Sequence, residues 1–293
     1  MIDLHSHSTA SDGRNSPADS ARYAAEKNLK VWALTDHDTV AGLHDAALVC
    51  KEKGLVFVPG IEITVTWPTG EFHLLGLGLT HCSDELKSLE AELKESRDER
   101  NQHIIEKMAE DGIHTSMEEI KSFCGVEQLG RPHFADYLVH TGIVKNRQAA
   151  FDKYLAQGRP WFTHHKGADL DASVSAIKSS GGVPVLAHPL SLYVSWGKIE
   201  GVLREIVSHG IQGLEAWHPG ARVGEAVRLE ELARTLGCFV TGGSDFHGEG
   251  VRADRHLGKT SGGKKIEDRF WYEELAPHLP NYSVDWWLKE PQN

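Results

Sequence analysis

Short apolar runs alternate with longer polar stretches over the first eighty residues. The runs have the length of buried strands, and Ser16, Pro17 and Asp19 are typical of a helix start. The expected strands are residues 31–34, 55–58, 63–67 and 71–79, and the expected helices are residues 16–28 and 41–53. This alternation predicts a parallel sheet or barrel, in which the chemistry lies on loops after the C-terminal ends of strands.

Two connections in this part of the chain carry further predictions. The strand at residues 55–58 is expected to lead into a loop, Pro59 to Glu62, that presents the glutamate. Pro68-Thr69-Gly70 predicts a hairpin turn between the strands at residues 63–67 and 71–79.

From residue 83 to about residue 158 the pattern changes to one helix after another, with almost no strand pattern. Helices are expected at residues 84–111, 132–140 and 147–156, and the residues from Ser116 to Glu119 fit a capping box. We expect residues 83–158 to be an all-helical insertion that caps the active site. Residues 1–82 and 159–293 would then form one barrel domain.

Strand and helix patterns alternate again in the last part of the chain. Three apolar runs each lead into a histidine or an acid, at residues 183–187, 211–216 and 238–241. The last thirty residues contain Trp271, Trp286 and Trp287 and are expected to fold back as a packed tail.

Composition excludes several classes of protein. The net charge of -11 argues against a broad nucleic-acid or anionic-membrane surface, although a local basic pocket stays open. No two cysteines have CxxC spacing, so zinc ribbons and dithiol redox motifs are not supported. No window approaches the roughly 18 apolar residues of a membrane span. We expect a cytoplasmic protein without a membrane partner.

The first thirteen residues place two histidines two positions apart. On an extended segment the side chains of His5 and His7 share one face and can bind a single ion. Asp12 could then bind the same ion or a neighbouring one. The alternative is a polar strand with two solvated histidines, and this pair alone does not decide between them.

Other predicted strand ends add nitrogen and oxygen donors. His73 stands in an apolar context, where a lone histidine is more often a core residue than a ligand. The candidate ligands are His5, His7, Asp12, His37, Glu62, His73, His188, Asp245 and His247. A set without thiolates suits two or three divalent ions, with Mn expected and Fe, Zn or Mg as alternatives, better than a structural cysteine site.

Five motifs, HSHSTASDG, LTDHDT, PGIEI, AHP and GGSDFH, resemble in order and spacing those of the PHP (polymerase and histidinol phosphatase) family of metal-dependent phosphoesterases. GRPHFADYLV and YLAQGRPWF in the helical stretch resemble the branch that contains nucleoside 3′,5′-bisphosphate phosphatases and the 5′-to-3′ RNase AM. The resemblance implies an α/β fold of the PHP type, a distorted TIM-like (β/α)7 barrel.

The resemblance also implies which residues share an ion. The first ion would have four ligands, the second would share Glu62 with the first, and the third would be separate. The implied sets are His5, His7, Glu62 and Asp245; Glu62, His73 and His188; and Asp12, His37 and His247. Some members carry histidine at the position of Asp12, so the identity and occupancy of the third ion stay open.

Phosphoester hydrolysis suits these residues. Three carboxylates cannot neutralise three divalent ions, so a filled site is positive and attracts phosphate. Paired metals make hydroxide available at neutral pH for attack on phosphorus. Asp245 is the expected catalytic ligand. His218 is a candidate proton donor to the leaving group, with a metal-bound water or a purely packing role for His218 as alternatives.

A second phosphate could bind at the predicted start of a helix in the insertion. Arg131 and His133 lie there, and helix N-termini favour anions. An ordinary exposed helix start is the alternative. Arg14, Lys153 and Arg159 are lesser candidates.

The leading hypothesis is a phosphatase that removes the 3′-phosphate from nucleoside 3′,5′-bisphosphates such as pAp. The main alternative is a 5′-to-3′ exoribonuclease acting on short 5′-phosphorylated RNA. An amidohydrolase on a related barrel and a catalytically inert PHP binding module are weaker alternatives. The expected partners are a small-molecule nucleotide and, under the main alternative, short RNA; no protein partner is predicted.

Overall fold

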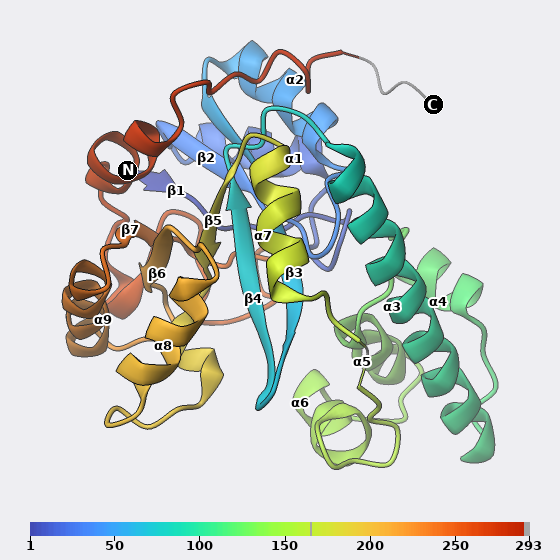
Figure 1. Ribbon diagram of the computed structural model, residues 1–293. Helices are drawn as coiled ribbons and strands as arrows, with labels where there is room; N and C mark the ends of the chain where they lie inside the picture. The colour runs from blue at the N-terminus through green and yellow to red at the C-terminus, as the bar shows by residue number, and fades with distance from the viewer. Residues whose placement is uncertain (165, 290–293) are drawn as a thin grey trace.

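The computed structural model describes residues 1–164 and 166–289 and contains a seven-stranded sheet (Figure 1). Its strands lie in chain order and are β1 (Ile2–Asp3), β2 (Val31–Leu34), β3 (Val56–Trp67), β4 (Gly70–Leu77), β5 (Val183–Leu186), β6 (Gly213–Trp217) and β7 (Phe239–Gly242). A parallel bridge between Ser6 and Phe246 links the two edges of the sheet. The sheet is therefore nearly closed into a barrel, as expected for a distorted TIM-like fold.

The sheet is mixed rather than parallel throughout. β4 runs antiparallel to both β3 and β5, while the remaining neighbours are parallel. The hairpin predicted at Pro68-Thr69-Gly70 is confirmed, because β3 and β4 pair from Trp67↔Gly70 to Gly60↔Leu77. A wholly parallel sheet is therefore the wrong description of this barrel.

β3 is one continuous strand, so the prediction of a loop from Pro59 to Glu62 is wrong. Proline and glycine are common in turns, but Gly60 is needed here for close packing. A Cβ at Gly60 would lie 2.8 Å from both the Gly76 carbonyl oxygen and Thr35 Cγ2. Glu62 consequently projects from the middle of a buried strand, which fixes its backbone more firmly than a loop would.

Helices cover the barrel part of the molecule. They are α1 (Pro17–Glu26), α2 (Leu43–Lys53), α7 (Leu170–Ser179), α8 (Ile199–Ser208) and α9 (Val223–Thr235). α1 begins as expected, because the side chain of Ser16 accepts a hydrogen bond from the Asp19 N–H and Pro17 occupies the first turn. The core beneath these helices is apolar, with Trp32, Leu34, Ile61 and Leu74 almost completely buried.

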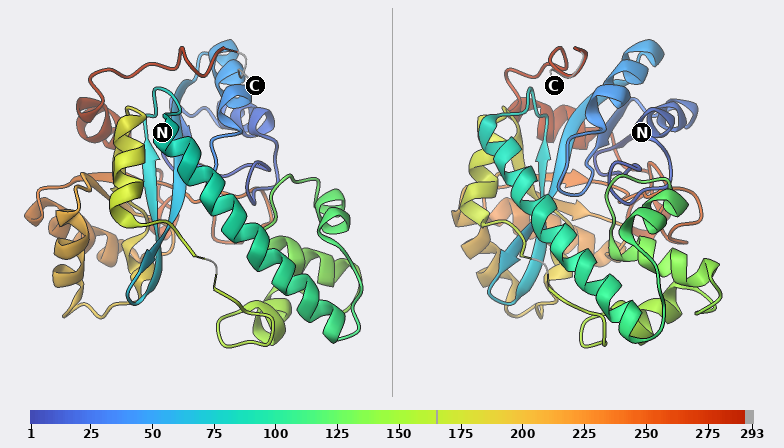
Figure 2. Two further views of the ribbon diagram at one scale, coloured as in Figure 1. Left: turned by 45° about the vertical axis from the view of Figure 1, so that its right-hand side comes forward. Right: turned by 90° about the vertical axis from the view of Figure 1, so that its right-hand side faces the viewer.

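The middle of the chain is helical, in α3 (Asp84–Glu110), α4 (Met117–Cys124), α5 (Arg131–His140) and α6 (Arg147–Ala150) (Figures 1 and 2). Two details differ from the predictions. The helix expected at residues 147–156 changes into a π-helical turn, Phe151–Leu155. Only half of the expected capping box forms, because Ser116 accepts from the Glu119 N–H while the Glu119 carboxylate bonds Thr115 and Tyr137 instead.

The helical segment has a hydrophobic core of its own. Ile104, Met108, Phe134, Leu138 and Trp161 belong to a buried cluster that is separate from the barrel core. Leucines in the first turns of α3, by contrast, lie in the barrel core. α3 thus takes part in both cores and connects them.

The C-terminal segment folds back over the barrel. The indole of Trp287 donates a 2.6 Å hydrogen bond to the Leu79 carbonyl, and Tyr282 bonds the Phe57 carbonyl. Trp271 and Trp287 are buried, whereas Trp286 is partly exposed, so the packed tail does not include all three tryptophans. Within the described residues, no helix combines the length and apolar character needed to cross a membrane.

Candidate metal centre

The nine predicted ligands come together at one end of the barrel. They form four groups, and the potential ligand atoms within each group lie within 4.8 Å of one another. The groups are His7, Asp12, His37 and His247; His5, His7 and Asp245; His5, Glu62 and His188; and His37, Glu62 and His73. Residues more than two hundred positions apart in the chain therefore share one site.

The expected geometry of His5 and His7 is present. Their rings lie on one side of the segment after β1, with centroids 5.2 Å apart. Ser6 between them points away, and its hydroxyl donates a 2.6 Å hydrogen bond to the Ala33 carbonyl. The alternation of an extended backbone thus aims both imidazoles into the site.

Glu62 lies at the centre of the cluster and is fully buried. Its Oε1 lies 2.9 Å from a ring nitrogen of His73 and of His188, and its Oε2 lies 2.9 Å from His37 Nδ1. The same Oε2 lies 3.3 Å from Nε2 of His5 and of His7. A carboxylate with different histidines on its two oxygens has the arrangement required of a bridging ligand.

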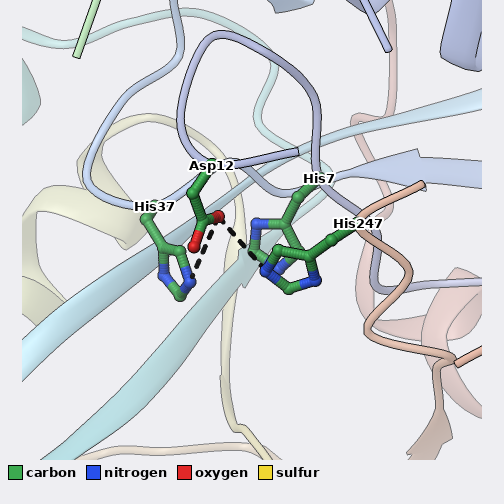
Figure 3. Close-up of side chains that lie close together, drawn as sticks. All are labelled: His7, Asp12, His37 and His247. Carbon is green, nitrogen blue, oxygen red and sulfur yellow. Dashed lines mark ion pairs between the residues drawn. The ribbon is translucent and has the colours of Figure 1, made fainter. Parts of the chain in front are cut away.

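Asp12 lies in a second part of the cluster (Figure 3). Its Oδ1 is 3.2 Å from His247 Nε2 and 3.8 Å from His37 Nε2, the two pairs drawn as dashed lines in Figure 3. The ring of His7 stacks against His247 with centroids 4.1 Å apart. His7 therefore stands between the set that contains Asp245 and the set that contains Asp12.

Several buried polar atoms of the cluster lack a hydrogen-bond partner. They are His5 Nε2, His7 Nδ1, His7 Nε2, Asp12 Oδ1 and Glu62 Oε2. A buried unsatisfied polar group costs about 1–3 kcal/mol, so a group of five in one place requires a reason. Nitrogen and oxygen donors of this kind are ligands for divalent ions, and the residues present therefore fit a metal centre.

The charges of the cluster also favour cations. Burial alone would lower the pKa of His7, but the carboxylates of Asp245 and Glu62, 3.3–3.4 Å from His7 Nε2, raise that pKa to about 10. Burial would raise the pKa of the Glu62 carboxyl, but the surrounding histidines hold it well below its usual range. The carboxylates thus favour positive charge on His7, which a metal ion can replace on binding.

Contacts behind the cluster orient its members. His5 Nδ1 donates to Glu215 Oε1 at 2.9 Å, which leaves Nε2 facing the site, and Glu215 Oε2 accepts the His188 N–H at 2.9 Å. Asp36 accepts three hydrogen bonds of 2.6–2.7 Å from Ser8 and Ser11 and so fixes the loop before Asp12. Such contacts set the tautomer and direction of metal-binding residues.

The sequence interpretation did not include Glu215. Glu215 is fully buried in the apolar strand β6, and an acid in such a strand was the feature that could have identified it. Three residues at the site have positive φ although they are not glycine: Asp38 (56°), His188 (27°) and Asp245 (52°). This backbone conformation is uncommon outside glycine and gathers at functional sites.

His218 lies beside the cluster, a position that suits either a proton donor or a packing residue. Its Nδ1 accepts the Gly220 N–H at 3.0 Å, so its proton resides on Nε2, 3.3 Å from Asp245 Oδ2. Arg252 and Arg255 approach the same carboxylate oxygen at 3.3 Å, and the sequence interpretation missed both. Their signal was their position within ten residues of the GGSDFH motif.

The candidate residues for binding a second phosphate do not all lie near the ligand cluster. His133 is buried and lines a cavity of about 360 Å³ together with Asp12 and Arg14. Arg131 lines neither of the two described cavities; its guanidinium lies 3.7 Å from Glu71 and over the ring of Phe162.

The remaining two lesser candidates lie outside both cavities. Lys153 lies over the ring of Tyr154, and Arg159 is exposed. Among the lesser candidates, only Arg14 therefore approaches the cluster.

The helical segment contacts the cluster directly. Arg97 of α3 forms an ion pair with Asp38, which follows His37 in the chain. The backbone at Gly130, just before α5, is close enough that a Cβ there would lie 3.9 Å from Asp12 Cβ. Two separate helices of the segment therefore meet the loops that carry His37 and Asp12.

Comparisons with known proteins agree with this geometry. The model of the PHP domain family matches residues 3–157. A 3′,5′-nucleoside bisphosphate phosphatase from Chromobacterium violaceum is 32% identical over 93% of this chain and 95% of its own length. A 5′-3′ exoribonuclease from Haemophilus influenzae is 32% identical over 84% of this chain and 89% of its own.

A solved structure from Chromobacterium violaceum, described as an amidohydrolase with bound sulfate and no metal, matches with a TM-score of 0.84 and 30% identity, covering 97% of this chain and 99% of that one. The family match spans more than half of the chain, and the relatives match most of it at 30% identity or above. The chain therefore belongs to the PHP domain family.

Proposed function

We propose that this protein is a metal-dependent phosphoesterase that removes the 3′-phosphate from nucleoside 3′,5′-bisphosphates. The observation that carries the proposal is the convergence of nine nitrogen and oxygen ligands around Glu62, with five buried donor atoms that no hydrogen bond satisfies. The bisphosphate phosphatase relative supports the choice of substrate because the similarity extends over nearly the whole of both chains.

The proposed ligands divide among two or three divalent ions, with Mn as the expected metal. His5, His7, Glu62 and Asp245 would hold the first ion, Glu62, His73 and His188 the second, and Asp12, His37 and His247 the third. Bound there, such ions would lower the pKa of water and offset charge on the phosphoryl group. Glu215 and Asp36 keep the ligands in position.

The chain supplies the other parts of the reaction. His218 has its proton on Nε2, at the edge of the cluster, and can pass it to the departing 3′-oxygen. Asp245 holds His218 and Arg255 in place through Oδ2 while its Oδ1 faces His7. His133, which lines the cavity beside Asp12, and Arg131, two residues before it in the chain, are the proposed contacts for the 5′-phosphate.

We further propose that residues 83–158 form a cap that measures the substrate. The Arg97–Asp38 ion pair and the position of His133 beside Asp12 support this role. Cytoplasmic location is proposed as well, since all four cysteines are free thiols and three of them are buried.

Hydrolysis of 5′-phosphorylated RNA is the second candidate, supported by the exoribonuclease relative. Both substrates present a phosphorus on a 3′-oxygen and a 5′-phosphate one nucleoside away. C–N bond hydrolysis, suggested by the description of the solved relative, would instead predict turnover of amides and indifference to inorganic phosphate.

Steady-state assays of the Mn-loaded protein test the proposal. We expect pAp to be hydrolysed with a kcat/KM orders of magnitude above that for histidinol phosphate, inhibition by phosphate, and no turnover of amides. Asp245→Asn should abolish hydrolysis while the thermal unfolding transition remains, and Asp84→Asn, at an exposed position on α3, is the matched control. An active Asp245→Asn variant, or a preference for histidinol phosphate, would reject the proposal.

A further inference from the structure

The loop after β2 carries His37, whose imidazole lies between two parts of the ligand cluster. His37 belongs to two of the four ligand groups, one that contains Asp12 and one that contains Glu62. Its Nε2 lies 3.8 Å from Asp12 Oδ1 (Figure 3), while its Nδ1 lies 2.9 Å from Glu62 Oε2. The position of this loop therefore decides whether one ring can meet both carboxylates.

Asp38, directly after His37, holds the loop against β3. Its φ of 56° is uncommon for a residue other than glycine, and such a conformation persists only where the surroundings fix it. The Asp38 N–H donates a 2.9 Å hydrogen bond to the Glu62 carbonyl, and Asp38 Oδ1 accepts the Thr64 N–H at 2.7 Å. β3 thus supports Asp38 from one side.

Helix α3 supports the same loop from the other side. Arg97 forms an ion pair with Asp38 Oδ2, and both side chains are buried. Two turns earlier on the same face of α3, Glu90 accepts the Val40 N–H at 2.7 Å. Removing one partner of a buried ion pair leaves a charge that water cannot reach, so the loop must shift to expose it. The Arg97 guanidinium therefore helps to keep the His37 loop in place.

A second loop of the proposed third ion also meets the helical segment. A Cβ at Gly130 would lie 3.9 Å from Asp12 Cβ, and the Gly130 N–H donates a 2.8 Å hydrogen bond to His133 Nδ1, which fixes the start of α5. His133 and Asp12 both line the cavity of about 360 Å³. Two of the three proposed ligands of this ion, Asp12 and His37, are therefore carried by loops that contact α3 or the start of α5.

Ligands of the first and second proposed ions are oriented from within the barrel. His5 Nδ1 donates to Glu215, and His188 Nδ1 lies 2.9 Å from Ser191 Oγ. Glu62 projects from the continuous strand β3. Because these supports belong to the barrel itself, the first two ions do not require the contact between Arg97 and Asp38.

We propose that Arg97 is a positioning residue that makes binding of the third ion depend on the helical segment. The guanidinium holds Asp38, and Asp38 places the imidazole of His37 beside Asp12. The helical segment thereby completes the metal centre as well as capping it. The inference rests on the proposed function, because it uses the division of ligands among three ions.

The test counts the Mn ions bound by the full chain in equilibrium with buffered free Mn, and calorimetric titration gives the affinity of each site. We expect three ions on the wild-type protein. Arg97→Gln should weaken one site by about 10–100-fold, as is typical for loss of a supporting contact, and leave the other two unchanged. Arg97→Lys should recover most of the affinity because it keeps the charge beside Asp38. Lys94→Gln removes the same charge from an exposed position on α3 and is the matched control.

Two combined variants identify the site that Arg97 acts on. In an Asp12→Ala background, which lacks a ligand of the third ion alone, Arg97→Gln should cause no further loss of Mn. Asp38→Asn removes the same ion pair, and asparagine tolerates a positive φ, so this variant makes the measurement even if Arg97→Gln does not fold. Arg97→Gln combined with Asp38→Asn should bind Mn no more weakly than Arg97→Gln alone, because residues that act through one contact are not additive.

The outcomes separate this inference from the proposed function. Wild-type affinities in Arg97→Gln, equal weakening of all three sites, or a further loss of Mn in the Asp12→Ala background would each overturn the role of Arg97. A wild-type protein that binds only two ions and hydrolyses pAp would overturn the inference and leave the phosphatase intact. Three bound ions without hydrolysis of pAp would reject the phosphatase, and the Mn counts of the variants would still decide the role of Arg97.

Discussion

Glu215 connects two proposed ligands that lie far apart in the chain. One of its oxygens accepts from His5 Nδ1 and the other from the His188 N–H. The space around this contact is filled, since a Cβ at Gly243 would lie 2.3 Å from His5 Cβ and 2.4 Å from Glu215 Oε1. Glycine at position 243 therefore permits the contact that orients His5.

Glu215→Gln should weaken metal binding without removing a proposed ligand. The amide keeps the shape of the side chain but loses the negative charge that favours Nδ1–H on His5, so His5 Nε2 is presented less well. Loss of such a supporting contact typically lowers metal affinity by about 10–100-fold. Titration of the metal-free protein with Mn, followed calorimetrically, measures the change. Glu118→Gln on the surface of α4 is the control, and equal affinities would show that Glu215 has no orienting role.

The site residues that the sequence predicted differ from those that it missed in how far along the chain their partners lie. His5, His7 and Asp245 stand in short local motifs, so neighbouring residues alone indicate their chemistry. Glu215 depends on contacts with His5 and His188, which follow other strands, and no local pattern contains such contacts. Arg252 contacts Asp245 from seven residues further along the chain, outside the motif itself. The structure brings the nine predicted ligands together, while their assignment to individual ions stays a prediction.

At the scale of elements, the alternation of apolar runs predicted most strands and helices. It failed where a residue type that is common in turns also occurs inside a strand. Pro59 and Gly60 resemble a turn, yet Gly60 lies inside β3 because of its contact with Gly76. Sequence patterns report local conformation and cannot show that a neighbouring strand requires a missing Cβ. Phe151–Leu155, expected to be α-helical, forms a π-helical turn, and its contacts offer no explanation for the difference.

The C-terminal segment is attached to the barrel by a buried carboxylate. Glu274 accepts hydrogen bonds from Arg234 on α9 and from the Val240 N–H on β7. Burial alone would raise the pKa of the Glu274 carboxyl, but these hydrogen bonds lower it below its ordinary value of 4.5. A depressed folded-state pKa stabilises the protein above the unfolded pKa, and this contribution is lost as the pH falls through the folded value.

Glu274→Gln should therefore destabilise the protein in a pH-dependent manner. At pH 7 we expect the free energy of unfolding to fall by about 1 kcal/mol, a value that allows for the partial exposure of Arg234. The difference from wild type should shrink as the pH decreases below 4.5, because the wild-type carboxyl then also becomes neutral. Urea denaturation at several pH values provides the measurement. A difference that stays constant with pH would mean that the charge of Glu274 is not responsible.

At the scale of the whole molecule, the two hydrophobic cores share α3. Its first turns pack in the barrel core and its later turns in the core of the helical segment. Because one continuous helix of 27 residues enters both, the cores cannot move apart without bending it. This rigidity is consistent with the proposed cap, which must keep His133 at a fixed distance from the metal ligands to select substrates by length.

The unsatisfied atoms of the cluster make the stability of the whole molecule depend on metal. An ion that binds the folded but not the unfolded chain stabilises it by about 2.7 kcal/mol per site at a concentration one hundred times Kd. For a chain of this size, each kcal/mol raises Tm by roughly 2–4 °C, so saturating Mn should raise Tm by at least about 5 °C over protein treated with a chelator. Differential scanning calorimetry measures the shift.

Glu62→Gln supplies the decisive comparison for this effect. Glu62 serves both the first and the second proposed ion, so its replacement should reduce the Mn-dependent shift more than replacement of Asp12, which serves only the third. Metal-free Glu62→Gln should itself unfold at a lower temperature than the metal-free wild type, because the surrounding histidines lose their opposing charge, so the Mn-dependent shift is measured within each variant. Equal Mn-dependent shifts in Glu62→Gln and wild type would refute the bridging role of Glu62, whatever their activities.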